Sequence, residues 1–105
     1  MPALRLWPST YPISAGTTSP DAVVDTEDID RIAVLGNSWG NRWWKGPQIR
    51  NLRRQLEERQ LAARVHKETT DDPSKPLEAV IEGILIVVRE AERVSDSYDL
   101  WYAGD

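Results

Sequence analysis

The sequence predicts a small two-layer domain of the α/β or α+β class, preceded by a proline-rich, extended N-terminal arm. Three observations predict it. The chain has 105 residues, which is the size of a single domain. Two segments repeat apolar residues at the spacing of amphipathic helices. Shorter β-branched or alternating segments lie before, between and after them, as is typical of strands. The expected order is arm, strand, helix, strand, helix and a short last strand.

The arm is expected over residues 1–28, and the domain over residues 29–105. Four of the seven prolines fall in the arm, two of them within the stretch "STYPISAGTTSP". Proline fixes φ and removes a backbone donor, so a long regular element is excluded here. Within the arm, "ALRLW" at 3–7 has the composition of a short edge strand.

The first half of the domain is expected to hold two strands and a helix. "IDRIAVLG" at 29–36 predicts the first strand. A helix is expected over residues 47–60, because Pro47 suits a first helical position and apolar residues then recur at helical spacing. These apolar residues are Ile49, Leu52 and Leu56. Alternation over 61–66 predicts a second strand, parallel to the first through a right-handed crossover.

The second half is expected to hold a helix over residues 77–91 and a last strand. Asp72 or Ser74 is expected to cap this helix. Its apolar stripe comprises Leu77, Val80, Ile81, Ile84, Leu85, Val88 and Ala91, widened by Ile86 and Val87. In the last strand, alternation places Tyr98, Leu100 and Tyr102 on one side and Trp101 on the other.

The charges of the chain are unevenly distributed. Residues 42–67 include eight Lys and Arg but only two Glu, which gives this segment a net charge of +6. Because the whole chain has a net charge of −4, the remainder carries −10. A basic middle between acidic flanks favours binding to nucleic acid or to a complementary protein surface.

Several kinds of site are excluded or disfavoured by composition. The chain has no cysteine, which excludes disulfides and thiolate zinc sites. His66 is the only histidine and is expected to be solvated, and the acidic run 25–30 lacks the turn glycine of a calcium loop. We therefore expect no cofactor, no metal site and no small-molecule substrate. No signal peptide and no membrane span are expected, so the predicted location is the cytoplasm or a virion.

Residues 36–40, Gly-Asn-Ser-Trp-Gly, fit the pattern G-x-S-x-G. Over these five residues the chain resembles the nucleophile elbow of α/β-hydrolases, in which the serine opens a helix. Here the predicted helix begins only at Pro47, and no histidine is placed to act as the base. We interpret the motif as a tight turn, with no catalytic residue, so the protein is not expected to be an enzyme.

The tryptophans near residue 40 are the strongest indication of a binding site. Tryptophan buries a large area and is enriched at the centres of interfaces. Because neighbouring residues cannot easily both point inward, Trp43 and Trp44 are not expected both to serve the core. The expected partner-binding residues are Trp39, Arg42, Trp43, Trp44, Lys45, Arg50, Arg53 and Arg54.

Three functional hypotheses follow. The first is a non-enzymatic assembly subunit that binds copies of itself or neighbouring protein subunits, most concretely in a phage head, neck or tail, by analogy with a class of small subunits that carry extended arms. The second is a nucleic-acid-binding protein that uses the basic helix 47–60 and the tryptophan loop. The third is an effector-associated regulatory module or a small enzyme.

The motif interpretation predicts that Ser38 is dispensable. Ser38→Ala should change the free energy of unfolding by no more than about 0.5 kcal/mol, as is usual for surface substitutions. Treatment with a serine-reactive phosphonate, followed by mass spectrometry, checks the chemistry. A covalent adduct on Ser38 would contradict the interpretation.

Overall fold

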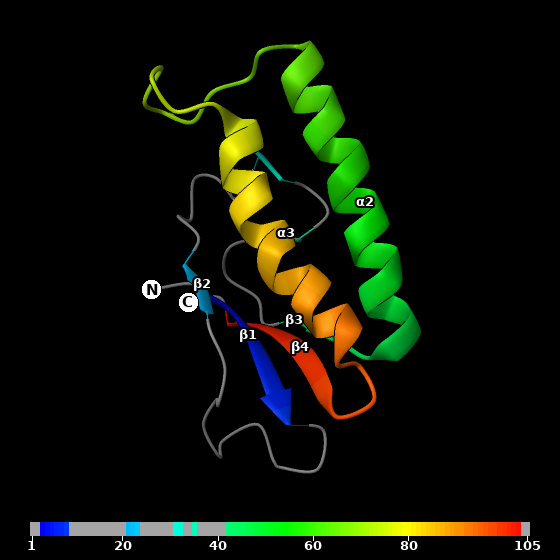
Figure 1. Cartoon of the computed structure of the whole chain (residues 1–105). Helices are drawn as coiled ribbons and strands as arrows, with labels where there is room; N and C mark the ends of the chain where they lie inside the picture. Colours follow the sequence, from blue (N-terminus) through cyan, green and yellow to red (C-terminus); the bar gives the residue numbers. More distant parts are fainter. Residues whose placement is uncertain (1–2, 9–20, 24–30, 33–34, 36–41, 104–105) are drawn as a thin grey trace.

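A four-stranded antiparallel sheet forms one layer of the protein, and two helices form the other (Figure 1). The computed structural model describes residues 3–8, 21–23, 31–32, 35 and 42–103. The strands are β1 (Ala3–Pro8), β2 (Asp21–Val23), β3 (Arg42–Trp44) and β4 (Tyr98–Ala103), and the helices are α2 (Gly46–Val65) and α3 (Leu77–Arg93). Across the sheet the order is β2-β1-β4-β3. This arrangement is an α+β fold, so the predicted class is confirmed.

β1 lies inside the sheet. It pairs antiparallel with β2 on one side and with β4 on the other, from Ala3 opposite Ala103 to Pro8 opposite Tyr98. Leu4 and Leu6 are buried in the core. The expected strand at 3–7 is therefore confirmed, but its expected place at an edge is wrong, and these residues of the predicted arm belong to the middle of the sheet. The predicted boundary at residue 28 lies outside the described residues and stays a prediction.

The strand predicted at 29–36 is wrong at each of its described residues. Arg31 has a helical backbone, and the N–H of Leu35 donates to the carbonyl of Ile32 at 3.0 Å in a tight turn. This turn brings Ile32 and Leu35 to the same side, and both are fully buried. In a strand, residues three apart would point to opposite faces.

The strand predicted at 61–66 is also wrong, because α2 continues to Val65. Leu61 and Val65 are 57% and 66% exposed, so the apolar residues that alternate along this segment are not all buried. Leucine, alanine and arginine are strong helix formers, and this propensity extends the helix. Without that strand there is no parallel crossover, and every strand pair in the described sheet is antiparallel.

α2 ends in a hydrogen-bonded cap at its C-terminus. Lys67, with φ of 52°, adopts the left-handed conformation just past the helix, and the N–H of Glu68 donates to the carbonyl of Ala63 at 2.9 Å. This pattern is the Schellman motif, with lysine where glycine is usual. The chain is thereby turned back towards α3.

α3 carries the apolar stripe predicted for the second helix. Val87 is buried as expected, but Ile86 is 63% exposed on the opposite side of the helix. The predicted cap is wrong, because Pro76 precedes the helix and its side chain cannot accept a hydrogen bond. Asp72 instead accepts from the N–H of Ser74 at 2.9 Å, within the connecting turn.

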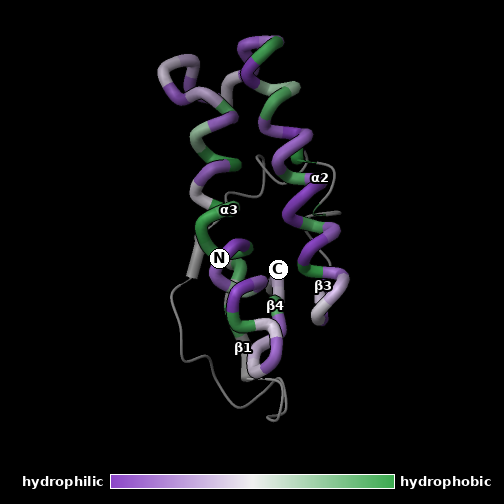
Figure 2. The backbone as a smooth tube through the Cα atoms, turned by 45° about the vertical axis from the view of Figure 1, so that its right-hand side comes forward, coloured by the Kyte–Doolittle hydropathy of each residue, from purple (hydrophilic) through white to green (hydrophobic). Residues whose placement is uncertain are grey.

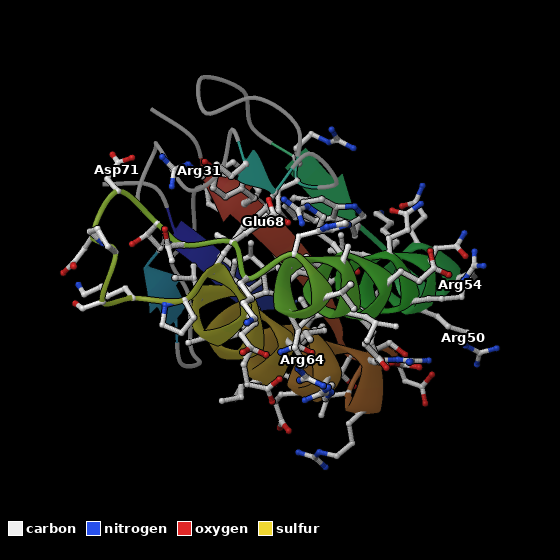
Figure 3. All side chains as sticks on the ribbon, turned by 90° about the horizontal axis from the view of Figure 1, so that it is seen from above. Arg31, Arg50, Arg54, Arg64, Glu68 and Asp71 are labelled. Atoms are coloured by element: carbon white, nitrogen blue, oxygen red, sulfur yellow. The ribbon has the colours of Figure 1, made fainter. Side chains whose placement is uncertain are left out.

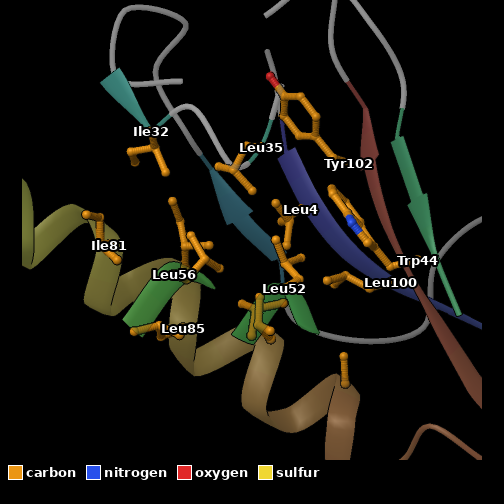
Figure 4. Close-up of a cluster of buried hydrophobic side chains, with 14 of the residues drawn as sticks. Leu4, Ile32, Leu35, Trp44, Leu52, Leu56, Ile81, Leu85, Leu100 and Tyr102 are labelled. Carbon is orange, nitrogen blue, oxygen red and sulfur yellow. The ribbon is translucent and has the colours of Figure 1, made fainter. Parts of the chain in front are cut away.

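The core lies between the inner face of the sheet and the two helices (Figure 4). Leu4 is paired in register with Tyr102, and Leu6 with Leu100, so β1 and β4 present a continuous apolar row. α2 and α3 pack side by side over this row, as Figures 1 and 2 show from two directions. From α2 the core receives Ile49, Leu52, Leu56 and Ala63, and from α3 Leu77, Ile81, Ile84, Leu85, Val87, Val88 and Ala91.

Two isoleucines of α3 provide a matched test of this packing. Ile84→Ala should lower the free energy of unfolding by about 2–5 kcal/mol, because it leaves a cavity in the core. Ile86→Ala makes the same chemical change on the exposed side and should shift stability by at most about 0.5 kcal/mol. Urea unfolding followed by circular dichroism measures both, and equal losses would show that the inward face is misassigned.

Candidate functional site

The neighbouring tryptophans of β3 point to opposite faces of the sheet. Trp44 is 7% exposed and belongs to the core, whereas Trp43 is half-buried on the other face. There its ring centroid lies 6.4 Å from that of Trp101, with the rings inclined at 45°. The prediction that only one of the pair serves the core is therefore confirmed. Trp39 lies outside the described residues.

An open groove of about 240 Å³ lies between β3 and α2. Three residues of β3 form one wall, and three amide residues of α2 together with Leu52 form the other. The lining residues are Arg42, Trp43, Trp44, Gln48, Asn51, Leu52 and Gln55. The guanidinium carbon of Arg42 lies 5.5 Å from the ring centroid of Trp44, which holds this exposed arginine at the groove.

The amide residues of α2 reach the groove because of their helical spacing. Gln48, Asn51 and Gln55 follow one another at intervals of three and four, so they share one side of the helix. The side chain of Gln48 also accepts from the backbone N–H of Lys45 at 3.1 Å, which fixes the start of α2 beside β3. Sequence reasoning missed these amides, although their spacing would have placed them together.

β3 is a terminal strand of the described sheet. It pairs with β4 through Arg42, Trp43 and Trp44, and no described strand pairs with its other side. An edge strand presents backbone donors and acceptors that can pair with another chain. The groove therefore runs beside a strand edge.

One predicted site residue, Arg53, and one further arginine of the basic helix, Arg59, form ion pairs within the molecule. Arg53 donates to Glu57 at 2.6 Å and also to Glu92, and these hydrogen bonds, the one to Glu57 foremost, raise its pKa. Arg59, also on the basic helix, donates to Glu68 at 2.6 Å and to the carbonyl of Arg31 at 2.8 Å. Both arginines thus stabilise the fold, and neither offers an uncompensated charge.

Four of the predicted site residues remain exposed. Arg42 and Lys45 flank the groove at the junction of β3 and α2. The Arg50 side chain is 77% exposed, with its Nε 3.8 Å from Glu92, and Arg54 donates to the side-chain oxygen of Asn51 at 3.1 Å. Figure 3 shows Arg50 and Arg54 projecting from α2 away from the sheet. Of these four cations only Arg42 lines the groove.

The other residues considered from the sequence form no site in the described part of the chain. His66 is exposed, as expected, at the C-terminal end of α2. No group of metal-ligating side chains was found in the described ranges. Ser38 and the acidic run 25–30 lie outside them. No helix among the described residues is long and apolar enough to span a bilayer.

Comparison with protein-family models, curated proteins and solved structures gave no match.

The Arg59–Glu68 contact predicts a pH dependence of stability. Hydrogen bonding to Arg59 holds the pKa of Glu68 below its ordinary value. The native state therefore binds fewer protons than the unfolded state, and this contribution is complete above the unfolded pKa of about 4.3. It is lost as the pH falls through the lower native value.

Glu68→Gln should therefore cost about 1 kcal/mol or less at neutral pH, as for a partly exposed ion pair. It should also flatten the fall in stability below about pH 4.3. Asp96→Asn is the control, because Asp96 is exposed and has no ion pair within the described residues. Urea unfolding across the acid range measures both variants. A Glu68→Gln profile parallel to that of the parent would refute this assignment.

Proposed function

We propose that the protein is a non-enzymatic interaction subunit of a larger protein assembly, and that the β3–α2 groove binds an extended segment of a partner protein. The observation that carries the proposal is the combination of a strand edge with a polar groove beside it. Addition of a strand to a sheet edge is a recurrent mode of peptide recognition.

The groove side of such a strand would meet polar groups. Each amide of Gln48, Asn51 and Gln55 offers both a donor and an acceptor, which suits contacts with peptide groups or short polar side chains. Arg42 and Lys45 add positive charge at the junction of β3 and α2, beside these amides. Acidic side chains are therefore favoured on this side of the bound segment.

The opposite side of the bound strand would meet an aromatic surface. Trp43 lies on the outer face of the sheet, half-buried beside Trp101. Because successive side chains of a strand point to opposite faces, the preferred segment alternates acidic and apolar residues. Apolar contact with Trp43 supplies affinity, and the exposed cations increase the encounter rate.

The assembly is most concretely a phage head, neck or tail. That part of the proposal depends on analogy with the class of small α+β subunits, because no motif of the chain identifies a family. An assembly role needs no catalytic group, in keeping with the interpretation of Ser38.

Nucleic-acid binding is the weaker hypothesis for this surface. The ring of Trp44 is in the core, so it cannot stack on a base without leaving that position. Arg53 and Arg59 are compensated by carboxylates, which reduces the cations free to contact phosphates. A single strand would still find Arg42, Lys45, Arg50 and Arg54, so the hypothesis is included in the test.

The test measures binding of a synthetic peptide of alternating valine and glutamate, about ten residues long, by tryptophan fluorescence and calorimetry. We expect dissociation constants in the micromolar to millimolar range and at least about tenfold weaker binding for Arg42→Glu, which reverses a charge at the groove. Lys75→Glu is the matched control, because Lys75 is exposed in the α2–α3 connection. A peptide N-methylated at alternate residues should not bind, since it lacks the strand donors.

Two outcomes would contradict the proposal. One is peptide binding that Arg42→Glu and N-methylation leave unchanged. The other is tighter, strongly salt-dependent binding of a single-stranded oligothymidylate with no peptide binding, which would favour the nucleic-acid hypothesis.

A further inference from the structure

The side of α2 that faces away from the core carries a regular seam of exposed residues. Its members follow one another at intervals of four, three, four, three and four residues, which is the spacing of a coiled-coil contact line. We call this set the outer seam: Pro47, Asn51, Arg54, Glu58, Leu61 and Val65, all exposed. No other described element covers it.

The C-terminal part of the outer seam is apolar. Leu61 and Val65 are 57% and 66% exposed, and they are one helical turn apart. Within the described residues, the third large apolar side chain with comparable exposure is Ile86, on the far side of α3. Figure 2 shows hydrophobic positions recurring along α2 to this end. An exposed apolar pair in line with a heptad pattern favours a helix as its partner.

The middle of the outer seam carries two opposite charges, neither of which forms an ion pair within the described residues. Neither Arg54 nor Glu58 has an ion pair there, and Arg54 contacts only the amide of Asn51. Other arginines of α2 behave differently. Arg53, Arg59 and Arg64 each contact a carboxylate within 2.7 Å. The outer seam thus carries one positive and one negative side chain, one helical turn apart, neither of which forms an ion pair within the described residues.

We propose that two copies of the chain associate through their outer seams, with the α2 helices antiparallel. In this register Arg54 of each copy lies opposite Glu58 of the other, which makes two symmetry-related ion pairs. Leu61 of one copy then packs on Asn51 of the other, and Val65 packs on Pro47. A two-fold axis repeats each contact, as a closed dimer requires.

The charges select the antiparallel direction. In a parallel, in-register pair, Arg54 would face Arg54 and Glu58 would face Glu58, and like charges held together oppose association. The antiparallel pair converts both repulsions into attractions. The apolar residues then lie at the two ends of the contact, beside the uncharged Asn51 and Pro47.

The dimer adds a wall to the groove described above. Asn51 belongs both to the outer seam and to the groove lining. The dimer carries two grooves related by symmetry. The groove of each copy therefore has Leu61 of the other copy next to it. The inference goes beyond the proposed function, because the seam contacts do not depend on any bound segment.

The test is the mass of the full chain in solution, by sedimentation equilibrium from about 10 μM to about 500 μM, where a small interface dissociates. We expect the mass to rise with concentration towards twice 11.9 kDa. Leu61→Glu and Glu58→Arg should each weaken dimerisation by about tenfold or more. The double variant Arg54→Glu, Glu58→Arg restores opposite charges and should recover the dimer. Ile86→Glu is the control and should leave dimerisation unchanged.

Three results would overturn the inference: a parent that stays monomeric throughout, a double variant no better than Glu58→Arg alone, or a dimer lost with Ile86→Glu but kept with Leu61→Glu. Circular dichroism verifies that each variant keeps its helices. Peptide binding by diluted, monomeric Leu61→Glu separates the two proposals, because loss of the dimer need not abolish groove binding.

Discussion

The pairing of β1 with β4 is the constraint on which the rest of the fold depends. It joins residues from near both ends of the sequence into the centre of one sheet, from Ala3 opposite Ala103 to Pro8 opposite Tyr98. The apolar row made by this pair is the surface on which the helices pack. Without β1, α3 would lose Leu4 and Leu6 as partners, and β2 would have no strand to join. The short edge strands β2 and β3 each extend this central pair.

α2 divides its surface among three tasks. One side enters the core through Ile49, Leu52 and Leu56. A second side borders the groove with its amides, and a third faces α3 through ion pairs that include Arg64 with Glu78. At its C-terminal end the helix projects past the sheet (Figure 1). The outer side is left with the seam.

Within the described residues, several of the opposite charges of the sequence are paired inside the fold. Arginines of α2 meet glutamates of α3 and of the connecting segment, as in Arg53 with Glu92 and Arg59 with Glu68. Opposite charges that are separated along the chain are therefore neighbours in space. Among the described residues, the positive charge left for an external partner is smaller than the composition suggests, and four such cations, Arg42, Lys45, Arg50 and Arg54, lie near the start of α2.

The sequence by itself determined the local elements: the start of α2 near Pro47, the stripe of α3, the alternation of β4 and the division between Trp43 and Trp44. Each follows from the period of a helix or a strand, which is a property of neighbouring residues. The tertiary structure decided that residues 3–8 occupy the middle of the sheet, and that helix propensity prevails over alternation at 61–65. The tertiary structure also decided which of the described arginines pair with carboxylates and which remain exposed. Strand pairing and ion pairs join residues far apart in the chain, so no local pattern records them.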